Sequence, residues 1–187
     1  GCPLLMMVVS PAICGTVISR YGTPAQKQRW LPGICDGTET MAFAITEPDA
    51  GTNSHNITTT ARRDGDDWVL SGRKAFVSGV DHAQAILIVA RTEDARTGKL
   101  KPALFAFPTD TPGFKATPIQ PKLSMRASIQ CEIELTDVRL PASALLPETK
   151  GLRGPFSCLN EARYGIIWGA MGAARDSIEA ALDYSKE

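Results

Sequence analysis

The chain has 187 residues, and its 43% hydrophobic content is ordinary for a folded globular protein and argues against disorder. Lys and Arg together number 20, as do Asp and Glu, so the formal net charge at neutral pH is zero. This balance provides no positive field that would gather nucleic acid or anionic lipid. No apolar run reaches the roughly 20 residues of a membrane-spanning helix, so we expect a soluble protein.

The cysteines and histidines argue against a metal centre. Five cysteines are scattered without a Cys-x-x-Cys pair, which also argues against a disulfide framework and fits a reducing compartment. His55 and His82 are too few for a histidine-rich site. We therefore expect no bound metal.

Residues 1–37 are predicted to be helical. The segment Leu4–Arg20 is apolar on most sides, as in a helix buried between others, and Pro11 predicts a kink or a break. A second helix is predicted to end near Leu31, before Pro32-Gly33. Between the two helices, Gly22 suits the C-cap of the first and Thr23 the N-cap of the second. Pro24 suits the first helical position, and Gln26 suits the partner position of a capping box.

Residues 38–150 change to the short apolar runs and Gly/Pro turns of a β-rich region. Asp64-Gly65-Asp66 predicts a hairpin turn between two of these runs. Strands at this density favour a small barrel or a sandwich. The predicted strands cover Met41–Ile45, Ile57–Arg63, Trp68–Ser71, Lys74–Val77, Ala85–Ala90, Ala103–Phe107 and Ile129–Leu135.

Residues 151–187 return to a helical pattern. From Pro155 to Lys186 there is no further proline, and apolar residues recur at helical spacing. Gly165, Gly169 and Gly172 lower the helix propensity, which favours close packing of this helix against another. The whole chain is predicted to be α+β.

The stretch that points to chemistry is Thr46-Glu47-Pro48-Asp49-Ala50-Gly51-Thr52-Asn53, directly after an apolar strand. Such a turn exposes backbone N–H groups and hydroxyls that can hold an anion or the polar edge of a ring. Taken alone, the stretch is a weak signal, because a turn of this kind after a strand is more often purely structural. A second element, Gly72-Arg73-Lys74-Ala75-Phe76-Val77-Ser78-Gly79, follows about 25 residues later.

Together the two elements resemble the signatures of the acyl-CoA dehydrogenase family. The second resembles the family's Gly-x-Lys-x-aromatic-aliphatic-Ser/Thr strand. The first departs at Asn53, where the family usually has Asp, and at Asn56, where it has a small residue. The matching residues of the first signature are Ala44, Ile45, Thr46, Glu47, Ala50, Gly51 and Thr52.

The resemblance extends over essentially all 187 residues and implies three segments. Residues 1–37 would end an N-terminal helical domain, and residues 38–150 would form an antiparallel β-barrel that binds flavin and acyl-CoA. Residues 151–187 would form the first helix of a C-terminal helical domain. We therefore expect the chain to be a fragment or the ordered part of a longer protein.

The resemblance also implies FAD as the cofactor and assigns residues to it. Thr46 would donate to the pyrimidine edge of the flavin, and Thr52 would bond the cofactor pyrophosphate or the acyl-CoA. Ser78 would donate near N5, the flavin atom that receives the hydride. Donors of this kind stabilise the charge of the reduced flavin. The full set of expected cofactor residues is Phe43, Ile45, Thr46, Gly51, Thr52, Phe76, Val77 and Ser78.

The C-terminal part resembles the glutaryl-CoA dehydrogenase branch, both over 154–166 and over 123–128. By this resemblance Asn160 and Arg163 would contact the CoA part of the substrate or brace the site, although Arg163 is equally placed for a structural ion pair. Leu4 stands where that branch has a carboxylate-binding Arg, which argues against a glutaryl substrate.

The family's reaction needs a carboxylate base for the α-proton, and the chain offers none at the two expected places. One place is far down the C-terminal domain, beyond Glu187; the other corresponds to Ala162, which cannot accept a proton. Glu161 is adjacent but lies about 100° around the helix. We expect the 187-residue chain alone to be inactive, with its base downstream.

The sequence is compatible with three functions. The first is an FAD-dependent acyl-CoA dehydrogenase, homotetrameric at full length, that passes electrons to an electron-transferring flavoprotein in a bacterial cytoplasm or the mitochondrial matrix. The second is a related flavoenzyme with another acceptor or substrate, such as an acyl-CoA oxidase or a nitroalkane-oxidising enzyme. The third is a non-catalytic module that binds flavin or acyl-CoA.

Overall fold

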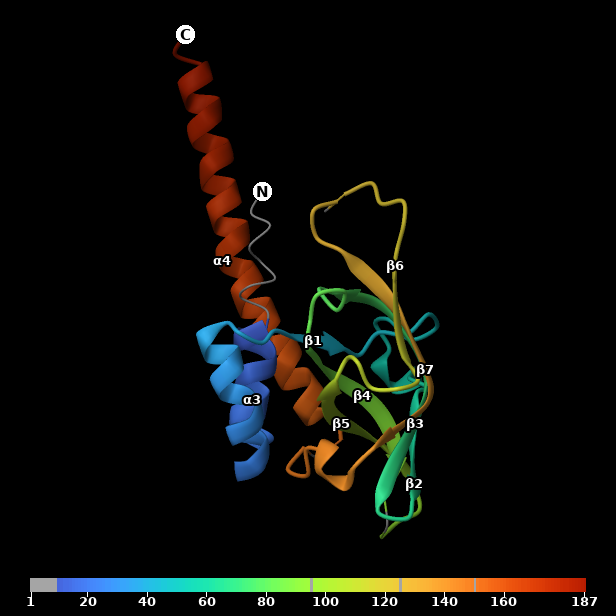
Figure 1. The fold of residues 1–187 in the computed structure, drawn as a ribbon. Helices are drawn as coiled ribbons and strands as arrows, with labels where there is room; N and C mark the ends of the chain where they lie inside the picture. The colour runs from blue at the N-terminus through green and yellow to red at the C-terminus, as the bar shows by residue number, and fades with distance from the viewer. Residues whose placement is uncertain (1–9, 95, 125, 150) are drawn as a thin grey trace.

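A curled sheet with helices against one side forms the body of the protein (Figure 1). The structure is a computed structural model and describes residues 10–94, 96–124, 126–149 and 151–187. The helical elements are a π-helical turn at Ser10–Gly15, α2 at Thr16–Tyr21, α3 at Pro24–Asp36, short 3-10 turns at Ser54–Asn56 and Ala142–Ala144, and α4 at Arg153–Tyr184. The strands are β1 (Met41–Ala44), β2 (Thr60–Asp64), β3 (Asp67–Ser78), β4 (Ala85–Glu93), β5 (Leu100–Pro108), β6 (Phe114–Pro118) and β7 (Gln130–Leu140).

The strands form one sheet in the order β1-β4-β2-β3-β7-β6, and β5 pairs with β4 away from this path. The α+β fold class is confirmed, but the expected antiparallel barrel is corrected to a curled sheet of mixed direction. Strand β1 runs parallel to β4, and β2 meets β4 in parallel through Thr60 and Arg91. Parallel pairing needs a long crossover, and here the chain between β1 and β4 contains the whole β2–β3 hairpin.

Strand β4 is buried on both faces and divides the interior into two cores. Ile86, Ile88 and Ala90 point into the curl of the sheet, where they pack with Trp68 and Phe105. The alternate residues of β4 point toward the helices, because successive side chains of a strand face opposite ways. They pack with residues of α2 and α3 in a second cluster that includes Leu87, Val89, Val17, Ile18, Trp30 and Ile34.

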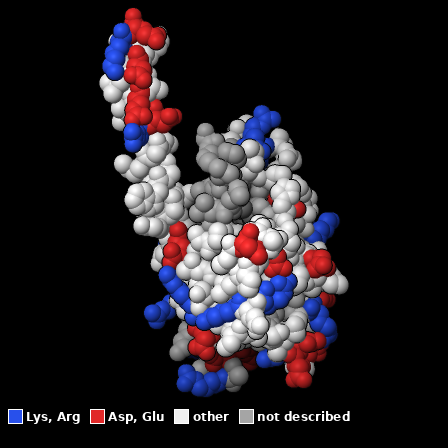
Figure 2. Space-filling model, turned by 60° about the vertical axis from the view of Figure 1, so that its left-hand side comes forward, with Lys and Arg blue, Asp and Glu red and all other residues white. Residues whose placement is uncertain are grey.

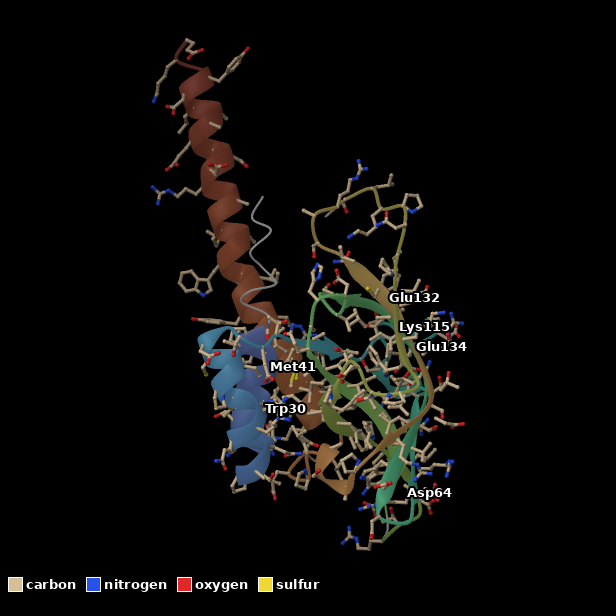
Figure 3. The ribbon with its side chains drawn as sticks, in the orientation of Figure 1. Trp30, Met41, Asp64, Lys115, Glu132 and Glu134 are labelled. Atoms are coloured by element: carbon tan, nitrogen blue, oxygen red, sulfur yellow. The ribbon has the colours of Figure 1, made fainter. Side chains whose placement is uncertain are left out.

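Helix α3 begins as predicted but is longer. Thr23 accepts from the Gln26 amide, and the Gln26 side chain accepts from the Thr23 N–H, which completes the capping box. The helix passes through Pro32 and ends at Asp36, so the predicted stop before Pro32 is wrong. Trp30 and Ile34 lie one turn apart and are both buried. The stabilisation from burying these two side chains outweighs the cost of the backbone hydrogen bond lost at the proline. Figure 3 shows Trp30 and Met41 at this boundary between helix and sheet.

Strand β6 was not predicted, whereas the other strands overlap the predicted runs, two of which, Trp68–Ser71 and Lys74–Val77, form the single strand β3. Strand β6 pairs with β7, and its half-buried Phe114 and Ala116 alternate with the exposed Lys115 and Thr117, but this alternation covers only four residues between Gly113 and Pro118. Lys115 stands opposite Glu134 across this pair, and Figure 3 shows both on the outside of the sheet. The predicted hairpin is confirmed, with Asp64 opposite Asp67.

Helix α4 extends away from the body, as Figures 1 and 2 show. Its first turns are anchored by the buried residues Gly154, Pro155 and Cys158. Farther along, apolar side chains are exposed, including Trp168 and Met171. At Gly165, Gly169 and Gly172 an added Cβ would meet no atom within 4 Å, so the described residues do not supply the packing partner expected there. None of the helices in the described ranges is long and apolar enough to cross a membrane.

Candidate functional site

The two sequence motifs lie side by side. The turn after β1 runs along β3, where the Ala75 amide donates to the Thr46 carbonyl oxygen over 2.9 Å. The Lys74 ammonium adds a second link, because it donates to the Ile45 carbonyl oxygen over 3.1 Å. Residues that are about 25 positions apart in the sequence are therefore fixed against each other.

A buried ion pair holds this junction together. Lys74 Nζ lies 2.8 Å from Glu47 Oε1, and the two side chains are 0% and 3% exposed. The other acceptor positions of the carboxylate are also used: Thr58 donates from its amide and its hydroxyl to Oε2, and the Thr59 amide donates to Oε1. A buried charge is tolerated only when it is paired and hydrogen-bonded in this way.

Both members of the pair are charged at neutral pH. Burial alone would raise the pKa of the Glu47 carboxyl, but the Lys74 charge and the hydrogen bonds to the carboxylate outweigh it and lower this pKa to about 2. Burial lowers the pKa of Lys74 to about 8, although Glu47 acts in the opposite direction. The pair therefore stays ionised between these two values.

The acid side of this titration gives a testable prediction. The folded-state pKa of Glu47 is lowered from 4.5 to about 2, so its stabilisation is complete above pH 4.5 and is lost as the pH falls toward 2. The loss is expected to be about 3 kcal/mol of unfolding free energy. Urea unfolding between pH 6 and pH 2 measures it, and the double variant E47Q/K74M, which has no pair to titrate, should lack this part of the slope. An identical slope in both proteins would contradict the assignment.

Phe76 directly follows this junction and has a strained backbone. Its φ is +58°, in the left-handed region that an L-residue with a Cβ rarely adopts. The residue lies where the β3–β7 register shifts between Lys74 and Val77, a bulge-like irregularity, and Phe76 itself is 68% exposed. Strain of this kind costs about 1–3 kcal/mol and is concentrated at ligand-binding positions. An exposed aromatic ring held by a strained backbone is therefore the most informative single feature of the site.

Within the described parts of the chain, three hydroxyl groups of the predicted site donate no hydrogen bond. Thr46 and Thr52 have no side-chain hydrogen bond there, and the Ser78 hydroxyl only accepts, from Gln130 Nε2 over 3.2 Å. Hydroxyl donors on the turn after β1 and on β3, together with the exposed Phe76 ring of β3, suit a planar, polar-edged cofactor that carries phosphates. The residues that are present therefore fit a flavin dinucleotide.

The remaining predicted cofactor residues differ in how exposed they are. Phe43 is half-buried on β1, and Ile45 is buried at the end of that strand. Gly51 is exposed, and open space surrounds the place where a side chain would be. The Val77 side chain lies in the core inside the curled sheet. Only the backbone of Val77 is therefore available beside the exposed Phe76.

The predicted substrate residues are close together on α4. Arg163 donates to the Asn160 side-chain oxygen over 3.3 Å, and both are exposed. Glu161 pairs instead with Arg20 of α2 at 2.9 Å, which gives it a structural contact between two helices. Ala162 packs at the edge of the core between the sheet and the helices. Leu4 lies outside the described residues.

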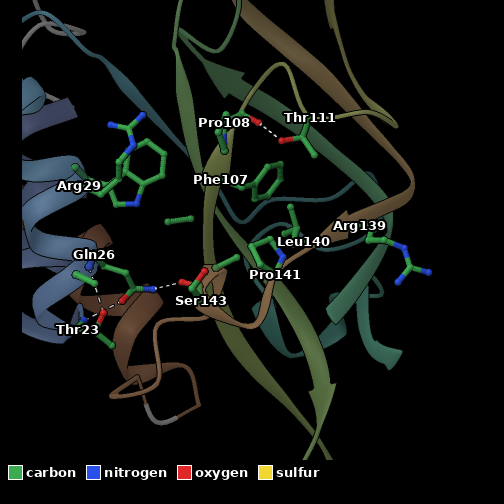
Figure 4. Close-up of a pocket in the computed structure, with 14 residues that line it drawn as sticks. Thr23, Gln26, Arg29, Phe107, Pro108, Thr111, Arg139, Leu140, Pro141 and Ser143 are labelled. Atoms are coloured by element: carbon green, nitrogen blue, oxygen red, sulfur yellow. Dashed lines mark hydrogen bonds between the residues drawn. The ribbon is translucent and has the colours of Figure 1, made fainter. Parts of the chain in front are cut away.

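A cavity of about 340 Å³ lies between α3 and β5 but contains none of the predicted site residues (Figure 4). Two of its long polar side chains, Gln26 and Arg29, already have partners. The Gln26 side-chain amide donates to the carbonyl oxygens of Ser143 and Leu145 at 2.7 and 2.9 Å, and Arg29 pairs with Glu39. Among its lining residues, the exposed Ser143 has a hydroxyl that makes no hydrogen bond within the described part of the chain.

Two residues of the site were not assigned a role from the sequence. Lys74 belongs to the second motif, and a lysine between apolar strand residues is a signal for a buried partner, which here is Glu47. Gln130 lies opposite Ser78 across the β3–β7 pair, more than fifty residues later, and nothing local in the sequence indicates this contact.

Comparison with known proteins identifies the family. Residues 42–138 match the family model of the acyl-CoA dehydrogenase middle domain, and residues 1–38 match that of the N-terminal domain. Acyl-CoA dehydrogenase FadE12 of Mycobacterium tuberculosis is 56% identical over 187 residues, which are 100% of this chain and 48% of that protein. The mitochondrial short-chain specific acyl-CoA dehydrogenase of Bos taurus is 33% identical over 98% of this chain and 44% of its own length.

A solved structure gives the same result. The glutaryl-CoA dehydrogenase of Mycobacterium smegmatis in complex with FADH2 superimposes with a TM-score of 0.86 at 46% identity, over 92% of this chain and 44% of that one. The chain thus spans about half the length of the proteins it matches. The middle-domain match alone covers more than half of the 187 residues, so this chain belongs to the acyl-CoA dehydrogenase family.

Proposed function

We propose that this chain forms the FAD-binding middle of an enzyme that dehydrogenates an acyl-CoA thioester between its α and β carbons. The observation that carries the proposal is Phe76, an exposed aromatic residue with a strained backbone next to the buried Lys74–Glu47 pair. FAD, when bound, supplies a two-electron acceptor for this reaction. The family membership and the FADH2 complex of the Mycobacterium smegmatis relative support this choice of cofactor.

Each group of residues has a separate task in this proposal. Phe76 presents its ring to the flavin, and Thr46 and Ser78 donate hydrogen bonds to the flavin edge. Fixed donors of this kind stabilise charge that develops nearby and need no reorganisation during the reaction. Thr52, beside the open space at Gly51, serves the pyrophosphate or the acyl-CoA. Phe43, Ile45 and the backbone of Val77 complete the lining.

Binding of the CoA part is assigned to Asn160 and Arg163 at the start of α4. Removal of the α-proton is assigned to a carboxylate outside these 187 residues, because Ala162 offers no proton acceptor and Glu161 is paired with Arg20. We also propose the divisions 1–37, 38–150 and 151–187, an electron-transferring flavoprotein as acceptor, and a homotetramer at full length. The mycobacterial and mitochondrial relatives support a bacterial cytoplasm or the mitochondrial matrix as the location.

The test uses the full natural protein that contains these residues, purified and reconstituted with FAD. The proposal expects a flavin absorbance spectrum at one FAD per chain, and bleaching of that spectrum by an acyl-CoA with a dye as electron acceptor. Peroxide release with oxygen as the acceptor would favour an oxidase instead. Stable FAD binding without reduction by any acyl-CoA, over a series of chain lengths, would favour a binding module.

Substitution of Phe76 separates the ring from the strain. Both F76A and F76G remove the ring, and each is expected to weaken FAD binding about three- to tenfold, the value of one aromatic contact. Only F76G also relieves the positive φ, so F76G should be as stable as F76A or more stable, despite the usual cost of glycine. Flavin fluorescence titration and thermal unfolding measure the two effects. Unchanged FAD affinity in both variants would remove Phe76 from the site.

A further inference from the structure

We propose that Gln130 is a positioning residue that sets the direction of the Ser78 hydroxyl, and that Lys122 sets the direction of Gln130. The inference rests on the proposed function, because it assigns the hydrogen of Ser78 to the flavin edge. It adds Gln130, the first residue of β7, and Lys122, in the loop before β7, to the site. The other site residues come from the turn after β1 and from β3.

The contact between Ser78 and Gln130 is fixed by the sheet. The two residues stand directly opposite each other at one end of the β3–β7 pair, so their side chains share a face. Gln130 Nε2 lies 3.2 Å from Ser78 Oγ and 3.0 Å from Ser128 Oγ. The Gln130 carbonyl oxygen accepts from the Ile119 amide over 2.8 Å, which anchors the backbone at this position.

Lys122 determines which end of the Gln130 amide faces Ser78. A lysine ammonium can only donate, and it contacts Gln130 Oε1 and the Ser128 carbonyl oxygen. The oxygen end of the amide must therefore face Lys122, and the NH₂ end must face Ser78. Without such a neighbour, the two ends of a glutamine amide are interchangeable in a hydrogen-bond network.

This order leaves the hydrogen of Ser78 available. A serine hydroxyl has one hydrogen and two acceptor positions. Because Gln130 fills an acceptor position, Ser78 need not donate to the protein, and it makes no such bond within the described residues. The chain of contacts from Lys122 through Gln130 to Ser78 thus points a hydrogen, and behind it a positive charge, toward the place assigned to the flavin. Such an arrangement stabilises the reduced cofactor more than the oxidised one.

The test measures the midpoint potential of FAD in the full-length holoprotein. In Q130M the hydroxyl loses its fixed donor, and in Q130E it meets an acceptor that draws its hydrogen away from the flavin. We expect the affinity for reduced FAD, relative to oxidised FAD, to fall about tenfold in Q130E and less in Q130M. For a two-electron couple, a tenfold change corresponds to a potential about 30 mV more negative. K122M, which leaves the amide free to turn over, should give a shift in the same direction.

A double-variant comparison distinguishes positioning from a general structural effect. In S78A the hydroxyl is absent, so adding the uncharged substitution Q130M should produce no further shift. In S78T, which keeps the hydroxyl, the Gln130 effect should return. Equal shifts with and without the hydroxyl, or no shift in Q130E, would overturn the inference while leaving the proposed function intact. Absence of FAD from the unsubstituted protein would overturn both, and thermal unfolding of each variant shows whether it is folded.

Discussion

Replacement of Lys74 by methionine is expected to lower the free energy of unfolding by about 3–5 kcal/mol, the cost of removing one partner of a buried ion pair. Methionine fills much of the space of the lysine stem but leaves the Glu47 carboxylate buried without a counter-charge. Lys74 is 0% exposed, so water cannot replace the lost ammonium without opening the junction. Urea unfolding at pH 7 measures the change.

The double variant E47Q/K74M should be more stable than K74M alone. It removes both charges, and neutral replacement of a buried pair costs less than leaving one charge unpaired. A control pair is available on α4, where Arg175 and Glu179 are 2.7 Å apart but 79% and 57% exposed. R175M should cost no more than about 0.5 kcal/mol. A double variant that is as unstable as K74M would mean that the cost arises from packing and not from charge.

The substitution K74M should also reduce FAD binding. Lys74 bonds the carbonyl oxygen of Ile45, and Ala75 next to it bonds that of Thr46, so the ammonium fixes the turn after β1 beside Phe76. K74M is therefore expected to weaken FAD binding more than R175M does. The ion pair acts on the cofactor only through the residues it positions, and it stabilises the alignment of the two family motifs.

The parts of the fold that the sequence predicts well are those with a local cause. The capping box at Thr23 and Gln26 is a pattern within four residues, and the hairpin at Gly65 depends on a two-residue turn. The apolar run of β4 likewise indicates a strand buried on both sides. Strand β6 was missed because the alternation of Phe114 and Ala116 with Lys115 and Thr117 covers only four residues and contains no long apolar run.

Features that depend on long-range pairing could not be predicted. The parallel pairing of β1 with β4 depends on where the β2–β3 hairpin lies, and the contact of Gln130 with Ser78 depends on the register of β7. In the candidate site, too, some features have a local sequence signal and others depend on tertiary structure. Thr46 and Ser78 followed from motifs, whereas the strained φ of Phe76 is a tertiary effect that no residue propensity indicates. The extension of α3 through Pro32 also reflects burial of Trp30 and Ile34.

Gly72→Ala is expected to destabilise the protein by about 4 kcal/mol, because it combines backbone strain with a steric clash. The φ of Gly72 is +151°, which an alanine rarely adopts. An added Cβ would lie 2.6 Å from Thr59 Oγ1 and 2.7 Å from Thr59 Cα. The second of these atoms belongs to the main chain, which cannot rotate away as a side chain can, so β3 and the segment before β2 must separate.

The clash at Thr59 connects this glycine to the cofactor site. The Thr59 amide donates to Glu47 Oε1 over 3.0 Å, so displacement of Thr59 removes a donor from the buried carboxylate. The matched control is Gly65→Ala, because Gly65 also has a positive φ, +62°, but has open space around it. G65A should cost only the backbone strain, about 1 kcal/mol, and leave FAD affinity unchanged. If G72A and G65A proved equally stable and bound FAD equally well, close packing of Gly72 on Thr59 would have no part in supporting the Glu47–Lys74 junction.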